Sequence, residues 1–150
     1  MAAKRGSSTN TAIATEAWRH LLDYFRLHQH HLKLAGEIGL NPGAMKMLFD
    51  LEPDDPRSMG ALAETFACDA SNITWMVDRL DERGLVERRT LPTDRRVKTI
   101  ALTPLGEKTK AELLDRFYEP PEEFLALPRE DLEALRVAIM KLPTSPPADD

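Results

Sequence analysis

Basic side chains gather in one short segment of the chain. Residues 88–98 contain four arginines and one lysine against one acid, Asp94, so their net charge is +4. Clustered cations of this kind bind phosphate, and Arg95, Arg96 and Lys98 are the candidates for contact with a nucleic-acid backbone or its minor groove. Asp94 either orients Arg96 through a charge-assisted hydrogen bond or is a plain turn residue. The alternative for the cluster is a solvated hairpin with a charged tip.

The net charge of −5 does not exclude nucleic acid, because the charge is unevenly distributed. Residues 107–150 carry 11 acids and 6 bases, whereas residues 1–106 sum to zero. The acidic excess therefore lies outside the segment that contains the cluster.

A second set of side chains, here called the groove face, has the types that read base edges. Asn72 can bond adenine bidentately and Arg79 can reach guanine or phosphate, whereas Trp75 offers one donor and a flat surface for a thymine methyl. Ser71 and Thr74 suit phosphate or mixed contacts. Each position has the alternative of an ordinary solvated helix residue. The groove face consists of Ser71, Asn72, Thr74, Trp75 and Arg79.

Helical spacing explains how these five side chains come to share one surface. The apolar residues between them recur at i, i+3, i+4 and i+7, which predicts one buried stripe. Asp69 is a good N-cap and Gly84 a good C-terminal stop. A second, shorter helix is predicted over 59–66, with Ser58 as its N-cap. A tight break separates it from the helix that follows Asp69, and the pair predicts a helix-turn-helix. The stripe predicted to face the core is Ile73, Met76, Val77 and Leu80.

Two short segments after Gly84 have the character of strands. Residues 85–89 and 97–102 are β-branched or alternating and are separated by a Pro- and Asp-containing turn, which predicts a hairpin. A hairpin directly after a recognition helix is a wing, so the cationic cluster would lie where a duplex backbone passes.

Further helices flank this lobe. An apolar stripe predicts a helix over 15–34, and Asn41 before Pro42 begins the next one. Thr103 before Pro104 begins a long helix that ends by Pro120, and a last helix runs from Pro128 to about residue 142. The sequence therefore predicts a mainly α protein with a two-stranded wing and N- and C-terminal helices.

Length and composition favour one soluble unit. The 150 residues suit one compact domain, and no apolar run approaches the ~18 residues of a membrane span. No apolar segment follows the charged N-terminus, so we expect a cytoplasmic protein. We expect a flexible arm over 1–12, a single unit over 13–142 and a disordered, Pro-rich tail over 143–150.

Neither catalysis nor a metal site is predicted. No nucleophile–base order, glycine-rich phosphate loop or carboxylate pair stands out, so we expect no enzyme and no cofactor. His20, His28 and His31 lie on a helix without an accompanying Cys or an HxxxH pair, so a zinc site is the lesser alternative. The lone Cys68 is expected to be a packing residue, although oxidation there would disturb the turn.

Several short motifs together resemble the MarR family of bacterial transcriptional regulators. They are Leu62-Ala63-Glu64, Ser71-Asn-Ile-Thr74, Val77-Asp78-Arg79-Leu80, Gly84-Leu85-Val86 and the stretch from Asp94-Arg95-Arg96 to Leu102-Thr103-Pro-Leu-Gly106. The D-x-R wing followed by L-T-x-x-G is the most specific of them. Trp75 is a departure, because family members often carry Arg there, and indole favours contact with a thymine methyl over the bidentate guanine recognition that Arg provides.

The resemblance implies a homodimer that represses transcription and is released by a small ligand. It implies a winged helix-turn-helix lobe over 41–103 and dimerisation helices over 13–36 and 104–142. Such a dimer would bind a pseudo-palindromic operator in double-stranded DNA. The implied ligand crevice, for an aromatic or amphipathic molecule, would be lined by Trp18, Leu22, Phe25 and Met45, which are otherwise plain core residues.

Two other hypotheses stay open. The lobe is alternatively a protein-interaction module in which Trp75 anchors a partner. It is also alternatively a metal-responsive repressor that uses the region of His20, His28 and His31.

Overall fold

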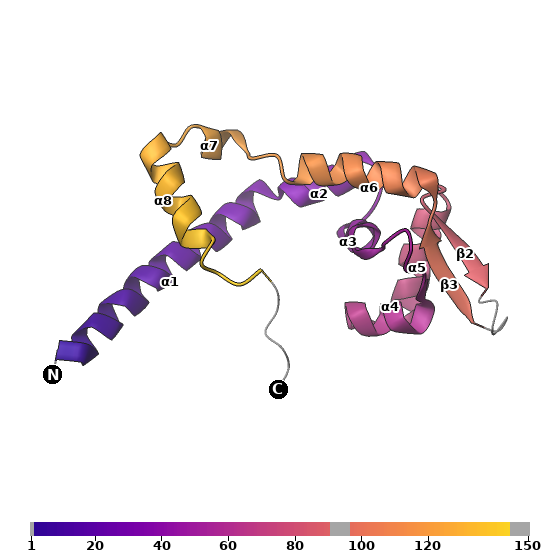
Figure 1. The fold of residues 1–150 in the computed structure, drawn as a ribbon, viewed down its shortest axis with the longest axis horizontal. Helices are drawn as coiled ribbons and strands as arrows, with labels where there is room; N and C mark the ends of the chain where they lie inside the picture. The colour runs from indigo at the N-terminus through magenta and orange to yellow at the C-terminus, as the bar shows by residue number, and fades with distance from the viewer. Residues whose placement is uncertain (1, 91–96, 145–150) are drawn as a thin grey trace. The chain divides into compact units, whose positions relative to one another are not determined.

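The computed structural model describes residues 2–90 and 97–144. The chain divides into two compact units, residues 1–117 and 118–150, and each is described here by itself. The first unit contains α1 (Ala2–His28), α2 (His30–Glu37), α3 (Pro42–Asp50), β1 (Arg57–Ser58), α4 (Met59–Phe66), α5 (Ala70–Asp81), β2 (Val86–Thr90), β3 (Lys98–Leu102) and α6 (Pro104–Phe117). The second contains α7 (Glu122–Leu125) and α8 (Arg129–Ile139) (Figure 1).

The predicted winged helix-turn-helix is confirmed. Helices α4 and α5 pack together after a short turn, and β2 pairs with β3 in an antiparallel hairpin that begins at Val86↔Leu102 and ends at Thr90↔Lys98. A third strand, β1, joins the other edge of β3, so the sheet order is β1-β3-β2. The sequence did not predict β1, because two residues are too few to show alternation.

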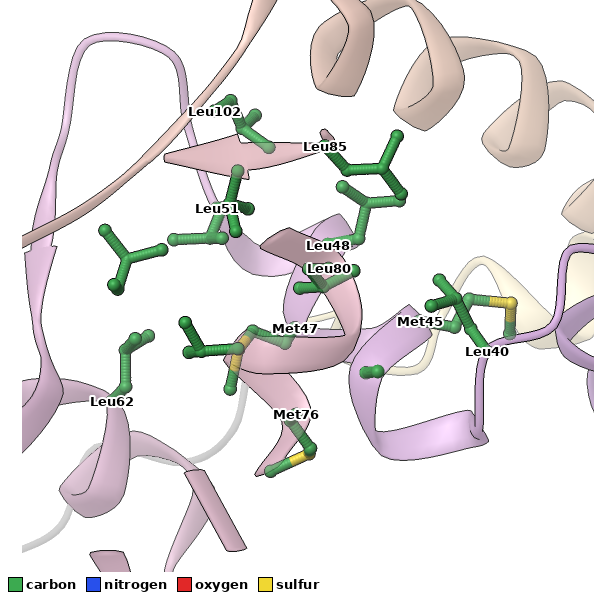
Figure 2. Close-up of a cluster of buried hydrophobic side chains, with 14 of the residues drawn as sticks. Leu40, Met45, Met47, Leu48, Leu51, Leu62, Met76, Leu80, Leu85 and Leu102 are labelled. Carbon is green, nitrogen blue, oxygen red and sulfur yellow. The ribbon is translucent and has the colours of Figure 1, made fainter. Parts of the chain in front are cut away.

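The core of the lobe forms where α3 and α4 pack against α5, which in turn contacts β2 of the sheet. The predicted stripe on α5 is buried, and Ile73, Val77 and Leu80 are completely enclosed. Figure 2 shows Leu80 close to Leu48 of α3, with Leu85 and Leu102 at the sheet side of the same cluster. The burial of this stripe fixes which side of α5 faces outward.

The long helix expected over 15–34 is in fact broken at Gln29. That residue has left-handed backbone angles, φ 39° and ψ 37°, and α2 starts directly after it. The prediction of one continuous helix was wrong because Leu32 continues the apolar spacing of α1. The spacing of apolar residues gives no sign of a single residue with left-handed backbone angles. At its other end α1 begins at Ala2, so the described part of the expected arm is helical.

The second unit contains two helices. Pro121 precedes the single turn of α7, and Pro128 precedes α8, where proline is tolerated because the first amides of a helix lack partners within it. Helix α8 ends at Ile139, three residues before the expected end. Residues 145–150 of the expected tail lie outside the described residues. The predicted domain boundaries stay a prediction.

The described helices include none with the length and apolar character needed to cross a membrane.

Replacement of Ala67 by glycine is expected to stabilise the lobe. Ala67 ends α4 with φ 47°, a left-handed conformation that costs a residue with a Cβ about 1 kcal/mol. Ala67→Gly should therefore raise the free energy of unfolding by roughly 0.5–1 kcal/mol in urea titration. As the matched control, Ala63→Gly inside the same helix should lower it by about 1 kcal/mol. Destabilisation by both substitutions would contradict the left-handed cap.

Candidate nucleic-acid interface

The first turn of α5 is held by the side chain of Asp69. Its Oδ1 accepts a hydrogen bond from the Ser71 hydroxyl at 2.5 Å and another from the Asn72 backbone amide at 2.9 Å. These donors favour the charged form, the Ser71 hydroxyl most and the amides after it, so they lower the pKa of Asp69 below its ordinary value. The result is a fixed helix start at which Asn72 occupies the first turn.

The cap is expected to make stability depend on pH. Because the pKa of Asp69 is lower in the folded chain, the ionised carboxylate adds stability in full above the ordinary value of 3.8, and this contribution is lost as the pH falls through the lowered folded value. Asp69→Ala should therefore be less stable than the wild type at pH 7, and the gap in urea midpoint should shrink at low acidic pH. Asp50→Ala, at an exposed position that ends α3, is the control. A gap that is the same at every pH would contradict the lowered pKa.

Helix α5 presents the predicted groove face to solvent. Ser71, Asn72, Thr74 and Trp75 are exposed, and Arg79 is half-exposed. The hydroxyl of Thr74 donates to the carbonyl oxygen of Ala70 at 2.8 Å. The hydroxyl protons of Ser71 and Thr74 are thus already donated within the protein. The side chains on this face that remain to contact DNA bases are Asn72, Trp75 and Arg79.

Trp75 and Arg79 form one unit on the outer side of α5. The Arg79 guanidinium carbon lies 5.7 Å from the centroid of the Trp75 ring, within the range of a cation–π contact. An Arg79 terminal nitrogen also donates to Glu82 Oε1 at 2.9 Å. Trp75 nevertheless remains 44% exposed. The pair therefore offers a flat apolar surface beside a guanidinium group that is oriented by Trp75 and by Glu82.

The arginines on β2 are not free cations. Arg88 is paired with Asp78 and, at 3.8 Å, with Asp81 on α5, whereas Arg89 pairs with Glu87 on its own strand at 2.6 Å. The net charge counted from the sequence includes both arginines as cations that are free to bind phosphate, because the sequence does not show which acids pair with them. The spacing of Asp78 and Asp81, three residues apart on one helix face, was the signal that could have indicated them.

The structure places the remaining wing residues only in part. Lys98 is exposed at the start of β3, where Thr90 is its partner across the hairpin. Asp94, Arg95 and Arg96 lie outside the described residues. Their assignment to phosphate or minor-groove contact stays a prediction.

The four residues proposed for a ligand crevice lie in different environments. Trp18, Leu22 and Phe25 are exposed along α1, whereas Met45 is buried in the core beside Leu40 (Figure 2). A hollow along α1 is lined by other, mainly polar side chains. They are Ala12, Thr15, Glu16, Arg19, His20 and Asp23.

The histidines and the cysteine do not form a described metal site. His20, His28 and His31 are exposed, and the His28 ring stacks on Tyr24 with 4.3 Å between centroids. Within residues 2–90 and 97–144, no three metal-binding side chains gather around a common point. Cys68 is half-buried against the core, where it packs as expected.

Comparison with known sequences identifies relatives of this lobe. A model of the MarR family matches residues 40–98. A Thauera aromatica protein, provisionally assigned as a transcriptional regulatory protein for the hcr operon, is 34% identical over 88 residues, which are 59% of this chain and 53% of that protein. The chain therefore spans about half the length of this curated relative.

Solved structures share the fold over most of the chain. The YusO protein of Bacillus subtilis superposes with a TM-score of 0.72 at 21% identity, over 88% of this chain and 94% of YusO. A mutant of S. aureus MepR bound to an oligodeoxyribonucleotide superposes with a TM-score of 0.68 at 16% identity, over 84% of this chain and 94% of MepR. At these identities the likeness establishes the winged-helix fold.

Proposed function

We propose that the chain is a transcriptional regulator of the MarR family that binds double-stranded DNA sequence-specifically as a homodimer. The match of the MarR family model to residues 40–98 and the likeness to a transcriptional regulatory protein support this proposal. The observation that carries the proposal is the groove face, which α5 presents to solvent beside the wing while its opposite stripe is buried. Members of this family are transcriptional regulators and not enzymes. The MepR structure with a bound oligodeoxyribonucleotide supports DNA as the partner of this fold.

Helix α5 has suitable dimensions for the major groove. Its 12 residues make it about 18 Å long, and the major groove is about 12 Å wide. The Asp69 cap holds its N-terminal turn, on which Asn72 is exposed. Asn72 would contact adenine, and the Trp75–Arg79 pair would meet a thymine methyl and either guanine or phosphate.

The remaining contacts would bind the DNA backbone. Lys98, together with Arg95 and Arg96, would contact phosphates or enter the adjacent minor groove. Ser71 and Thr74 would donate hydrogen bonds to DNA phosphates only if they gave up the hydrogen bonds that they make to Asp69 and Ala70. Affinity would thus come mostly from the wing and specificity mostly from α5.

Exposed apolar side chains support a homodimer. On α1, Trp18 is 59% and Phe25 56% exposed, and Leu22 lies between them on the same helix face. Helix α8 also exposes apolar residues, among them Val137 and Ile139. Large apolar surfaces of this kind mark protein interfaces. A two-fold dimer would place its two α5 helices on half-sites about one helical turn, ~34 Å, apart.

A small aromatic or amphipathic effector would release the DNA. Three of the proposed crevice residues, Trp18, Leu22 and Phe25, are exposed on the single chain, so a partner subunit would be needed to enclose a ligand there. Such a ligand would act by favouring a dimer in which the two α5 helices no longer match the half-site spacing. The regulator would then be a repressor in its unliganded state.

Substitutions on α5 and on the wing are expected to affect DNA binding differently. Asn72→Ala should lower discrimination at one base pair by about 1–3 kcal/mol and leave the salt dependence unchanged. Lys98→Ala should weaken binding to all sequences alike and reduce the log–log salt slope by about one for each protomer. Fluorescence anisotropy with one operator and its single-base variants, at several salt concentrations, measures both effects. Equal losses on every sequence for Asn72→Ala would contradict base reading by α5.

A further inference from the structure

Arg88 joins the wing to the recognition helix. Its guanidinium pairs with Asp78 Oδ1 through a terminal nitrogen, and its Nε lies 3.8 Å from Asp81 Oδ2. Asp78 and Asp81 are one helical turn apart on α5, whereas Arg88 lies in the middle of β2 opposite Ile100. One side chain of the wing therefore contacts two carboxylates of the helix.

The neighbouring arginine provides an internal comparison. Arg89 points to the opposite face of the sheet, as successive residues in a strand do, and its partner Glu87 lies on the same strand. The Arg89 pair therefore does not connect the wing to α5. Of the two adjacent cations, Arg88 alone is in a position to fix the angle between the two elements.

We propose that Arg88 is a positioning residue, which holds the wing at a set angle to α5 and does not itself contact phosphate. The inference rests on the proposed DNA-binding function and deepens it. A duplex fits only when α5 lies in the major groove while the wing meets the adjacent backbone, so the angle between the two elements determines whether both contacts form together.

The charges around Arg88 support this assignment. A phosphate contact would require Arg88 to leave Asp78 and Asp81, and both carboxylates would then face a polyanion without their counter-charge. In the paired arrangement the guanidinium offsets part of the negative charge of the two acids on the side of α5 next to the wing. Because the three side chains are partly exposed, their pairing contributes little to folding stability, and its effect should be seen in DNA affinity.

Removal of the acid distinguishes the two roles by the sign of the effect. Asp78→Asn deletes a negative charge beside the DNA and frees Arg88 from its main partner. If Arg88 contacted phosphate, this variant would bind DNA more tightly. If Arg88 sets the wing angle, Asp78→Asn should bind about fivefold more weakly, Arg88→Gln should do the same with an unchanged salt slope, and the double variant should lose no more than either single variant.

The experiment compares these variants with Glu87→Gln as the matched control, in anisotropy titrations of one duplex at 50 and 200 mM salt. Glu87→Gln removes an equal charge from β2 without touching α5, so it should leave binding unchanged or strengthen it. Tighter binding by Asp78→Asn, additive losses, or a shallower slope for Arg88→Gln would overturn the inference while leaving the proposed function intact. Failure of the wild type to bind any duplex would instead overturn the proposed function, and the inference with it. Urea midpoints of the wild type and the four variants test whether each protein is folded.

Discussion

Alanine at position 106 is expected to destabilise the lobe by about 3 kcal/mol or more, at the upper end of the cost of overpacking a core. Gly106 is buried in the first turn of α6, and a Cβ there would lie 1.9 Å from the carbonyl oxygen of Leu85. That oxygen already accepts the backbone amide of Thr103 at 3.1 Å. The clashing atom belongs to the backbone at the base of the wing, where Leu85 and Thr103 are hydrogen-bonded, so no side-chain rotation can relieve the clash. Urea unfolding of Gly106→Ala measures the loss.

Gly60→Ala is the matched control for this variant. Gly60 lies within α4, and the nearest atom to an added Cβ is Ser58 Oγ at 4.0 Å. Because this position is helical and open, alanine should stabilise the lobe by roughly 0.5–1 kcal/mol. If Gly106→Ala unfolds at the same urea concentration as the wild type, α6 does not approach Leu85 as closely as described.

A charge on the apolar face of α1 is expected to abolish the proposed homodimer and, with it, high-affinity DNA binding. Leu22 is 47% exposed between Trp18 and Phe25, so glutamate there is harmless to a monomer but would be buried in a dimer interface without a counter-charge. A monomer contacts one half-site only, so affinity for the full operator should fall by roughly 10²–10⁴. Sedimentation equilibrium and anisotropy titration measure the two effects of Leu22→Glu.

His20→Glu places the same charge on the opposite face of α1, where the hollow is lined by polar residues such as Glu16 and Arg19. This control should remain dimeric and should bind DNA like the wild type. A monomeric wild type, or a Leu22→Glu protein that is still dimeric, would show that this face of α1 is not the subunit interface.

The helices of the lobe could be predicted from the sequence because their signals are local. Asp69 caps α5 as predicted, and Gly84 has the left-handed φ of 67° that suits the predicted C-terminal stop. The alternation of buried and exposed residues along α5 follows from periodicity alone. Asn41 and Ser58 likewise accept the backbone amides expected of N-caps. Such features depend on residues within four positions of one another.

The features that sequence reasoning missed depend on contacts between distant residues or on a single dihedral angle. Strand β1 exists because Arg57 and Ser58 pair with Ile100 and Thr99, far along the chain. The break at Gln29 is one left-handed residue in a continuous apolar pattern. The pairing of Arg88 with Asp78 requires the fold of the wing onto α5, so a count of local charge overestimated the free cations.

Selection of binding sites from random double-stranded DNA by the full chain tests most directly whether the outer side of α5 reads sequence. We expect enrichment of a pseudo-palindrome whose half-sites are centred about 34 Å apart. Affinity for it should fall about 10³-fold or more between 50 and 200 mM salt, as expected for roughly six or more phosphate contacts. Selection with Asn72→Ala should lose preference at one position of each half-site. Recovery of no common sequence, or binding that is insensitive to salt, would contradict a DNA-reading role for α5.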